Sequence, residues 1–254
     1  MITEKLPISV VMLSYNSEKE IKDSLDSVKW ADEIIVIDSY SRDRTVDIAK
    51  ECGAKVYQHD FLGFAKEWEF GISKAKNEWV LILATDERIP EELADEIKEA
   101  IKNSDYDGYK IPRLNYYLGF KLKFTTWPDY QLRLFKKSRA RVVDREVHEH
   151  VVVNGKVGKL KNPVIHLPME TVEDRINKMN RYTTLEARQI LKEGRRITVA
   201  HLIFLPLWTF IYRFFIRGGF LDGVGGFAFS INAAYYSFIA HFKAFNIKLK
   251  NKEL

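Results

Sequence analysis

Two carboxylates that could bind a metal ion, Asp86 and Glu87, stand just after an apolar run at residues 79–83. The run contains no Gly or Pro and lies between two stretches typical of helices, so we expect a buried parallel strand. Side chains beyond the carboxyl end of such a strand lie in the crevice where open α/β sheets bind ligands. Hard oxygen ligands there suit Mg²⁺ or Mn²⁺ on a substrate's phosphates. The plainer interpretation is a strand followed by the solvated acidic start of a helix.

Polar side chains also follow two earlier apolar runs. Ser14, Tyr15 and Asn16 come after the first run, and Asp38 ends the second. Tyr15 could stack on a base, while Ser14 and Asn16 could bond to the base or its ribose. Asp38 could accept a hydrogen bond from a ribose hydroxyl or a base N–H. Each of these is an ordinary turn or cap residue by itself, but parallel strands would bring all three sites to one edge of one sheet.

Alternating apolar runs and helix-like stretches must position these side chains. We expect strands at residues 8–13, 33–37, 54–58 and 79–83, and helices at 18–29, 46–52 and 64–76. This β-α-β-α-β-α-β alternation predicts a parallel sheet with right-handed crossovers. A charged helix at 91–103 then leads to strands at 109–113, 131–135, 151–153 and 163–165, whose pairing order stays open. The chain is therefore predicted to be an α/β protein.

The C-terminal part changes character after a long polar helix expected at 172–192. Residues 197–212 are almost wholly apolar and aromatic, a glycine-rich turn follows at 218–226, and a second apolar segment covers 227–245. Each segment is shorter or more interrupted than the roughly 20 apolar residues that span a bilayer. We expect a helix pair in the membrane interface, held by aromatic and basic anchors. A buried helical hairpin and an oligomer interface are the alternatives.

Composition excludes some classes of protein. The 254 residues carry a formal net charge of +5, which suits a phosphate-bearing substrate or an anionic membrane. No basic helix is interleaved with residues that read bases, so nucleic acid is not an expected partner. The single Cys52 excludes an internal disulfide and a cysteine-based zinc site. No signal peptide is evident at the N-terminus, and no glycine-rich dinucleotide fingerprint follows the first strand.

The first 90 residues, with VVMLSYN, ADEIIVIDSYSRDRTVDIA, GAKVY and a strand ending in TDE, resemble the inverting family 2 glycosyltransferases. Later motifs, WPDYQLRLFKK, VHEHV, NRYTTLEA and RGGFLDGVGG, are similar to the branch of lipopolysaccharide core β-1,4-glucosyltransferases. The resemblance implies a GT-A (Rossmann-like) fold with a mixed, mainly parallel sheet. It implies a catalytic domain at 1–170, with a nucleotide-sugar half at 1–90 and an acceptor half at 91–170. A helical extension at 171–254 would rest on the membrane.

The resemblance also implies roles in binding the donor. Tyr15 and Asp38 would hold the nucleotide of a UDP-sugar, with Ser14 and Asn16 beside them. Lys66 matches a basic position that approaches the donor phosphates in the family. Asp86 matches the last acid of the family's DxD motif, which usually ligates Mg²⁺ or Mn²⁺.

In inverting transfer an acceptor hydroxyl attacks the anomeric carbon while a carboxylate removes its proton. The candidates for this base are Asp129, which we favour, and Glu149. Arg133 could neutralise the diphosphate, and His148 could be a further metal ligand or contact phosphate. His166 is a weaker candidate. A turn carboxylate, a surface ion pair and structural histidines are the plainer interpretations of these residues.

The chain departs from the family pattern at two positions. Ala84 replaces the first acid of the DxD motif, and Glu69 stands where many relatives carry Asn. We therefore carry three hypotheses. The first is a hexosyltransferase, with glucose as the expected sugar, that acts on a lipopolysaccharide-core or other lipid-linked acceptor as a cytoplasmic protein peripheral on the inner face of the cell membrane. The second changes the acceptor to polyprenyl phosphate or another surface glycan. The third is a nucleotide-sugar-binding paralogue with impaired catalysis.

Overall fold

The structure is a computed structural model that describes residues 5–102, 105–143, 150–169 and 171–250. The chain divides into two compact units. The first consists of Met1–Leu114 and Pro128–Met169, and the second of Asn115–Trp127 and Glu170–Leu254. The second unit thus includes a segment from the middle of the chain, inside the stretch expected to form the acceptor half.

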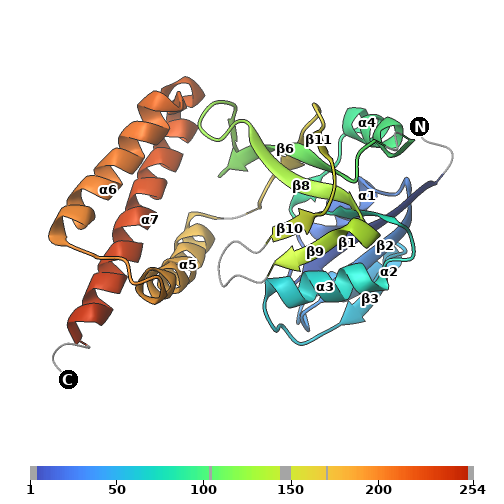
Figure 1. Ribbon diagram of the computed structural model, residues 1–254, viewed down its shortest axis with the longest axis horizontal. Coiled ribbons are helices and arrows are strands. Elements are labelled where there is room, and N and C mark those ends of the chain that lie inside the picture. The colour runs from blue at the N-terminus through green and yellow to red at the C-terminus, as the bar shows by residue number, and fades with distance from the viewer. Residues whose placement is uncertain (1–4, 103–104, 144–149, 170, 251–254) are drawn as a thin grey trace. The chain divides into compact units, whose positions relative to one another are not determined.

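Four parallel strands form the centre of the first unit (Figure 1). They are β1 (Leu6–Ser14), β2 (Ala31–Asp38), β3 (Lys55–Gln58) and β4 (Trp79–Ile82). Their spatial order is β3-β2-β1-β4, with β1 paired parallel to both β2 and β4. The expected alternation of strands and helices is confirmed, and all four strands end at the same edge of the sheet.

Antiparallel strands extend the sheet beyond β4 in the order β8-β6-β12-β5. These are β5 (Glu87–Arg88), β6 (Gly108–Tyr117), β8 (Asp129–Lys136) and β12 (Val164–His166). β11 (Val157–Lys159) pairs with β6, and β9 (Ala140–Val143) with β10 (His150–Val153) in a separate sheet. A short 3₁₀ turn at Lys137–Arg139 links β8 to β9. The sheet is therefore mixed, as predicted. Because β8 runs antiparallel to β4, β8 begins at the edge where β4 ends.

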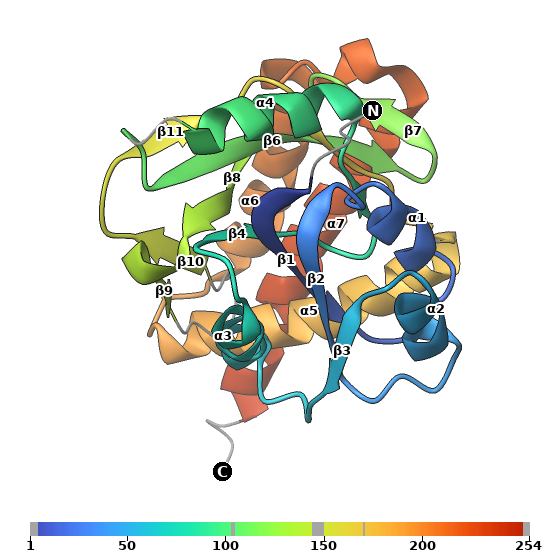
Figure 2. The ribbon, with the colours of Figure 1, turned by 90° about the vertical axis from the view of Figure 1, so that its right-hand side faces the viewer.

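Helices cover both faces of the parallel strands, which explains why the inner strands β1, β2 and β4 are mostly apolar and buried. Figure 2 shows α3 (Phe64–Lys74) on one side of β1–β3, and α1 (Ile21–Asp26) and α2 (Thr45–Glu51) on the other. Alternate residues of β1 enter two cores: Val10 packs with α1, α2 and α4 (Glu91–Lys102), and Val11 packs on the side of α3. A Cβ at Gly71 of α3 would come within 2.6 Å of Cγ1 of Val11. Glycine at this position therefore lets the helix approach the sheet closely.

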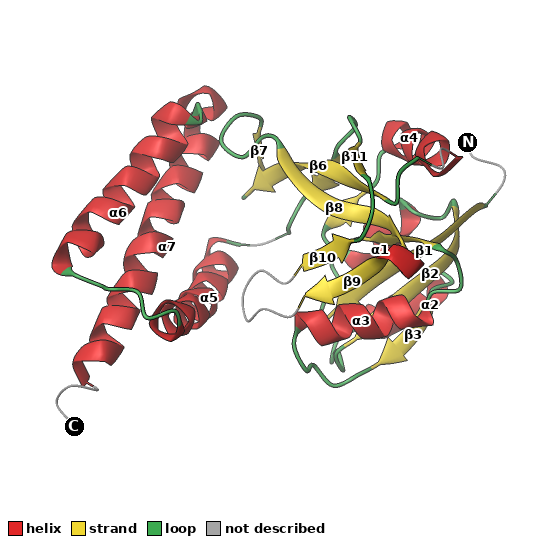
Figure 3. Ribbon diagram, in the orientation of Figure 1, coloured by secondary structure: helices red, strands yellow, loops and turns green. Residues whose placement is uncertain are grey.

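Three long helices form most of the second unit (Figure 3). They are α5 (Val172–Lys192), α6 (Val199–Ile211) and α7 (Gly223–Lys250), and both α5 and α6 pack against α7. A π-helical turn at Tyr212–Ile216 and a 3₁₀ helix at Gly219–Asp222 join α6 to α7. A Cβ at Gly226 would overlap the carbonyl oxygen of Gly219, so the expected glycine-rich turn serves a close helix-to-turn contact. The end of β6 pairs with β7 (Phe120–Leu122) in the same unit.

Polar contacts between side chains and backbone stabilise the second unit. The Lys243 ammonium of α7 donates to the carbonyl oxygen and Oδ1 of Asn180, and to the hydroxyls of Thr183 and Thr184, all at 2.7–2.9 Å. Burial lowers the pKa of Lys243 from its ordinary value. Asp222 accepts the N–H groups of Lys123, Phe124 and Thr125 and the hydroxyl of Thr125. The segment after β7 is thereby tied to the turn that precedes α7.

The apolar segment of α6 is open to solvent within its unit. Residues Val199–Ile216 have a mean hydropathy of 1.7 over 18 residues, and none of this window is buried. By length and composition alone, this stretch is long enough to cross a membrane. The most exposed large side chains of α6 include Ile203, Phe204, Leu207 and Trp208. A soluble helix normally buries such a stripe, so this surface calls for a partner.

Candidate active site

The turns after β1 and β2 are joined to each other at the carboxyl edge of the sheet. Ser14 and Asp38 are register partners at the ends of these strands, and the Ser14 hydroxyl donates to Asp38 Oδ1 at 3.0 Å. Asp38 also accepts the N–H of Ser41 at 2.9 Å and its hydroxyl at 2.5 Å. Nε2 of Gln58 lies 3.4 Å from Oδ2. Asp38 is fully buried, so its carboxylate holds the two turns together from beneath.

A second set of hydrogen bonds joins the same two turns closer to solvent. Asn16 accepts the N–H of Arg42 at 2.9 Å and donates its own N–H to the Ser41 hydroxyl. Asp43 accepts the N–H of Glu18 at 3.1 Å. Burial alone would raise the pKa of Asp43, but hydrogen bonds from Thr45 and from the Glu18 N–H outweigh it and hold that pKa below its ordinary value. The two turns therefore form one hydrogen-bonded platform.

Two exposed tyrosines stand on this platform. Tyr15 is 57 % exposed on the turn after β1, and Tyr40 is 52 % exposed on the turn after β2. Tyr40 has φ +56°, an uncommon conformation for a bulky side chain and one often found at functional sites. Tyr40 could not be recognised from the sequence, because its backbone conformation leaves no mark in the residue pattern. Both rings are available to stack on a planar group.

The turn after β4 presents Asp86 to His166. Oδ2 of Asp86 lies 3.2 Å from Nε2 of His166, and both side chains are about one-fifth exposed. The backbone carbonyl of Asp86 accepts the N–H of Leu167 at 2.9 Å, which fixes the turn against the segment after β12. His166, the weaker candidate in the sequence, thus contacts the most strongly predicted metal ligand. Ala84 leaves this turn with one carboxylate fewer than the family pattern.

Glu87 is fully buried, and its carboxylate is engaged within the fold instead of facing the site beside Asp86. Its buried carboxylate accepts the N–H of Ala84 at 3.0 Å and Nη2 of Arg133 at 2.6 Å. Nη1 of Arg113 lies 3.8 Å from the same carboxylate. Nε of Arg133 is buried and has no hydrogen-bond partner among the described residues. A water or a substrate oxygen at this edge would satisfy that donor.

Arg113 also holds the favoured base candidate, Asp129. The two residues are register partners on β6 and β8. Asp129 Oδ2 accepts Nε of Arg113 at 2.9 Å and lies 2.8 Å from Nη2, while Oδ1 accepts Nε2 of Gln131 at 2.7 Å. The Arg113 guanidinium and the Gln131 amide together set the orientation of the Asp129 carboxylate at the edge where β8 begins. Arg113 is a site residue that sequence reasoning missed, because only the strand register brings it to Asp129.

The remaining residues singled out in the sequence lie either on α3 or outside the described residues. Lys66 is exposed in the first turn of α3, and Glu69 is exposed one turn further along. A helix that follows a parallel strand runs back along the sheet, so the start of α3 lies at the carboxyl edge with the other candidates. Glu149 and His148 lie outside the described residues.

The donor set partly fits a divalent cation. Within the part of the chain that the structure describes, no three His, Cys, Asp or Glu side chains form a group that could hold a metal ion. The Asp86 carboxylate suits Mg²⁺ or Mn²⁺, and these ions commonly complete their shells with substrate phosphates and water. The arrangement therefore fits an ion that arrives with a diphosphate better than an ion in a closed protein cage.

Together, the layered α/β fold and the polar edge define a transferase of the GT-A type. The chain belongs to glycosyl transferase family 2, whose sequence model matches residues 9–154. It is thus a glycosyltransferase, and the predicted family is confirmed.

The similar proteins include both sequence relatives and a solved structure. The chain is 34 % identical to an uncharacterized glycosyltransferase of Rickettsia typhi over 261 residues, which covers 97 % of this chain and 89 % of the relative. It is 26 % identical to LpsC, a lipopolysaccharide core biosynthesis glycosyltransferase of Rhizobium meliloti, with 95 % and 93 % covered. The crystal structure of S. aureus TarS 1-349 in complex with UDP-GlcNAc aligns with a TM-score of 0.52 at 16 % identity, over 96 % of this chain and 92 % of that one.

Proposed function

We propose that the protein is an inverting transferase that moves a hexose, glucose as the expected sugar, from a UDP-sugar to a lipopolysaccharide-core or other lipid-linked acceptor. The observation that carries this proposal is the meeting of the Tyr15–Tyr40 platform, Asp86 and Asp129 at one edge of one sheet. The lipopolysaccharide core role of LpsC supports the acceptor class. The bound UDP-GlcNAc of TarS is consistent with a UDP-sugar donor, although that likeness concerns the fold alone.

In the proposed complex, the exposed rings of Tyr15 and Tyr40 stack on the base, and the platform fixed by Asp38 carries the ribose. The negative charge of the diphosphate meets Lys66, Arg133 and the N-terminal end of α3. Asp86 is the residue that would hold Mg²⁺ or Mn²⁺, which would neutralise the departing diphosphate. His166 orients the Asp86 carboxylate by donating a hydrogen bond to it.

In the chemical step, Asp129 is proposed to act as the base. The acceptor oxygen forms a bond to the anomeric carbon as the carbon–oxygen bond to the diphosphate breaks, and UDP leaves with that electron pair. The proton of the acceptor hydroxyl passes to the Asp129 carboxylate. Arg113 and Gln131 hold this carboxylate in one orientation, which is how a base is kept aligned with an incoming hydroxyl.

The second unit is proposed to contact the inner face of the cell membrane from the cytoplasm. Its exposed stripe of Phe204, Leu207 and Trp208 is followed in the chain by the basic Arg213 and Arg217, and Lys248 and Lys250 stand near the end of α7. Aromatic and basic side chains of this kind anchor helices in the membrane interface. A lipid-linked acceptor would be presented at the same surface.

Ala84 keeps a second candidate function open. Loss of one DxD acid favours a paralogue that binds a nucleotide sugar with weak or no turnover. A polyprenyl phosphate or another surface glycan is the alternative acceptor for an active enzyme.

The test measures UDP release from UDP-glucose with Mn²⁺ or Mg²⁺, together with thermal shifts across UDP-, GDP- and dTDP-sugars. We expect metal-dependent turnover that Asp86→Asn and Asp129→Asn abolish, and a shift with the UDP-sugar that Tyr15→Ala reduces. Binding without turnover would favour the impaired paralogue. Full turnover by Asp129→Asn would remove its assignment as the base.

The membrane contact has its own test in liposome flotation of the full-length chain. The double variant Phe204→Ser/Trp208→Ser should lose flotation, because both side chains are exposed and apolar. The matched control Phe61→Ser/Phe64→Ser changes two exposed aromatic residues of the first unit and should float normally. Equal flotation of both variants would contradict the proposed contact, and resistance of the wild-type protein to carbonate extraction would point to a spanning helix instead.

A further inference from the structure

Two arginines and two carboxylates form one continuous ionic cluster in the first unit. Arg113 of β6 contacts Oδ2 of Asp129 with one side of its guanidinium, through Nε at 2.9 Å and Nη2 at 2.8 Å. Its third nitrogen, Nη1, lies 3.8 Å from Oε1 of Glu87. The same Oε1 accepts a hydrogen bond from Nη2 of Arg133 at 2.6 Å. The guanidinium of Arg113 therefore lies between the proposed base and a buried acid.

The two oxygens of Glu87 have different partners. Oε1 faces the two guanidinium groups, and Oε2 accepts the N–H of Ala84 at 3.0 Å. The N–H of Glu87 in turn donates to the carbonyl oxygen of Ala84 at 3.1 Å. These two bonds close the turn that carries Asp86. The turn that presents the predicted metal ligand and the carboxylate of Asp129 thus share one set of contacts.

A β-bulge brings Arg133 into this cluster. The successive residues Tyr109 and Lys110 of β6 pair with Leu134 and Leu132 of β8, so the register passes over Arg133. Leu132 and Leu134 accordingly pack into different cores, although residues two apart in a regular strand share a face. Bulges of this kind re-aim side chains beside active sites. The extra residue lets the Arg133 side chain join the cluster while its neighbour Leu134 stays in the core.

The exposure of the cluster increases toward Asp129. The side chain of Glu87 is 0 % exposed and that of Arg133 is 14 % exposed, against 27 % for Arg113 and 24 % for Asp129. The inner pair is shielded from water, which screens such contacts only weakly. The outer pair is open to solvent, where an acceptor would arrive. The cluster is therefore a support with a buried end and an open end.

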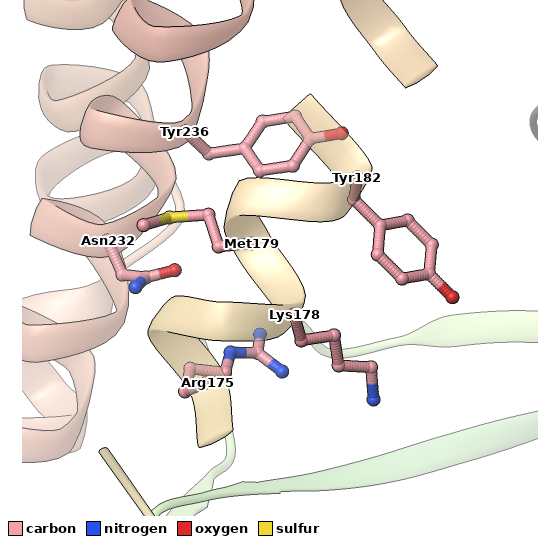
Figure 4. Close-up of a pocket in the computed structure, with 6 residues that line it drawn as sticks. All are labelled: Arg175, Lys178, Met179, Tyr182, Asn232 and Tyr236. Carbon is pink, nitrogen blue, oxygen red and sulfur yellow. The ribbon is translucent and has the colours of Figure 1, made fainter. Parts of the chain in front are cut away.

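An arginine of the second unit has a different arrangement. Figure 4 shows the six side chains that line a pocket of about 200 Å³ between α5 and α7, and Arg175 is one of them. The guanidinium carbon of Arg175 lies 5.3 Å from the centre of the Tyr117 ring. This cation–π contact contributes to packing within that unit. Arg113 instead contacts two carboxylates that come from different elements of the first unit.

We propose that Arg113 is a positioning residue for the transfer, and that it fixes the Asp129 carboxylate relative to the turn that carries Asp86. This role rests on the proposed function, and it ties the acceptor's side of the reaction to the donor's side. The planar fork of a guanidinium can hold two carboxylates at once, whereas the ammonium of lysine is a single point of charge. Displacement of a reacting group by about 1 Å can cost roughly 100-fold in rate.

Steady-state kinetics of UDP release from UDP-glucose with Mn²⁺, in which water takes the place of the acceptor, test this role. Arg113→Lys keeps a positive charge but cannot hold both carboxylates. We expect its kcat to fall by about 10- to 100-fold while its KM for UDP-glucose stays within about twofold of the wild-type value. Arg113→Ala should lose more, and added methylguanidinium should restore its kcat by at least about fivefold. Methylammonium at the same concentration should not restore it.

The link to the Asp86 turn has a test of its own. Glu87→Gln should lower kcat, and Arg113→Lys/Glu87→Gln should cost little more than the worse single variant, because both changes break the same link. The matched control is Arg141→Ala, which removes an exposed arginine from β9. It should keep the wild-type kcat and should not respond to methylguanidinium. The assays are run at a temperature at which circular dichroism shows every variant to be folded.

The outcomes separate this role from the proposed function. Normal kcat in Arg113→Lys, with an active wild-type protein, would overturn the positioning role alone. A loss of kcat in Arg113→Ala that methylguanidinium does not restore, together with loss of the thermal shift caused by UDP-glucose, would show a merely structural residue and would also overturn it. Independent, multiplicative effects of Arg113→Lys and Glu87→Gln would overturn the link to the Asp86 turn. Absence of UDP release by the wild-type protein would overturn the proposed function itself.

Discussion

The Glu87 carboxylate and the Arg133 guanidinium form a 2.6 Å ion pair across β5 and β8, and Glu87 is fully buried. The same carboxylate accepts the N–H of Ala84, so the pair shapes the turn that presents Asp86. Glu87 is therefore engaged in holding the turn and is not placed to replace the acid missing at Ala84. The predicted metal site after β4 therefore depends more on Asp86 than the adjacent acids Asp86 and Glu87 in the sequence indicated.

The first prediction concerns this ion pair. Glu87→Gln should lower the free energy of unfolding by about 3 kcal/mol, because removing one partner of a buried pair leaves the other charge uncompensated. The double variant Glu87→Gln/Arg133→Met should recover part of this loss. Urea unfolding followed by tryptophan fluorescence measures both. A single variant as stable as the wild-type protein would show that the pair is not buried as described.

The second prediction separates the roles of Asp86 and His166. Asp86→Asn should reduce turnover by at least about 100-fold, which corresponds to roughly 2.7 kcal/mol of lost metal-assisted stabilisation. His166→Ala should weaken the apparent Mn²⁺ affinity by about 10- to 100-fold, as is typical for residues that orient a ligand. His166→Gln retains a donor and should restore most of that affinity. If Gln and Ala are equally impaired, His166 binds the ion directly.

The third prediction concerns acid stability at the opposite edge of the sheet. Burial alone would raise the pKa of Glu33, but hydrogen bonds from Lys55, the Lys76 N–H and Ser9 outweigh it and hold that pKa below its ordinary value. The folded state therefore favours the ionised carboxylate, so its stabilisation is complete above the ordinary glutamate pKa and is lost as the pH falls through the lowered one.

Glu33→Gln should accordingly cost about 2 kcal/mol of unfolding free energy at pH 7. The difference from the wild-type protein should shrink as the pH is lowered below about 4.3, the ordinary glutamate pKa. Urea midpoints measured from pH 7 to pH 3 give the comparison. Glu69→Gln changes an exposed carboxylate on α3 and serves as the control, which should follow the wild-type curve. A constant difference at every pH would contradict the titration of Glu33.

The fourth prediction concerns Asp222, which accepts three successive backbone N–H groups. Burial alone would raise its pKa, but hydrogen bonds from Thr125 and from the N–H groups of Lys123 and Phe124 hold it below its ordinary value. Asp222→Asn places an amide donor against these donors and should cost about 2 kcal/mol. Hydrogen exchange should then quicken at Phe124 and Thr125. Lys123→Ala keeps its backbone N–H and should leave exchange unchanged.

The strand-and-helix alternation of the first unit was predictable because its signals are local. Apolar runs such as the one preceding Ala84 predict buried strands, and the polar residues that follow these runs indicate the functional edge of the sheet. Register is not local, so the pairing of Arg113 with Asp129 and of Glu87 with Arg133 could not be foreseen. The helix expected at residues 18–29 covers only Ile21–Asp26. The backbone N–H groups of Ser17 and Glu18, just before it, donate instead to Thr45 at the start of α2 and to Asp43.

The platform formed by Asn16, Ser41 and Asp43 has a thermodynamic consequence for the donor. Two loops that are already bonded to each other lose little conformational entropy when a nucleotide arrives. Donor binding should therefore be fast and should leave the backbone almost unchanged, with the ordering cost falling on the exposed tyrosine rings. Selectivity among nucleotides would then come from the fit of a rigid surface. A variant that loosens this surface, such as Asn16→Gly, should lower the association rate constant of the donor more than it lowers the free energy of unfolding.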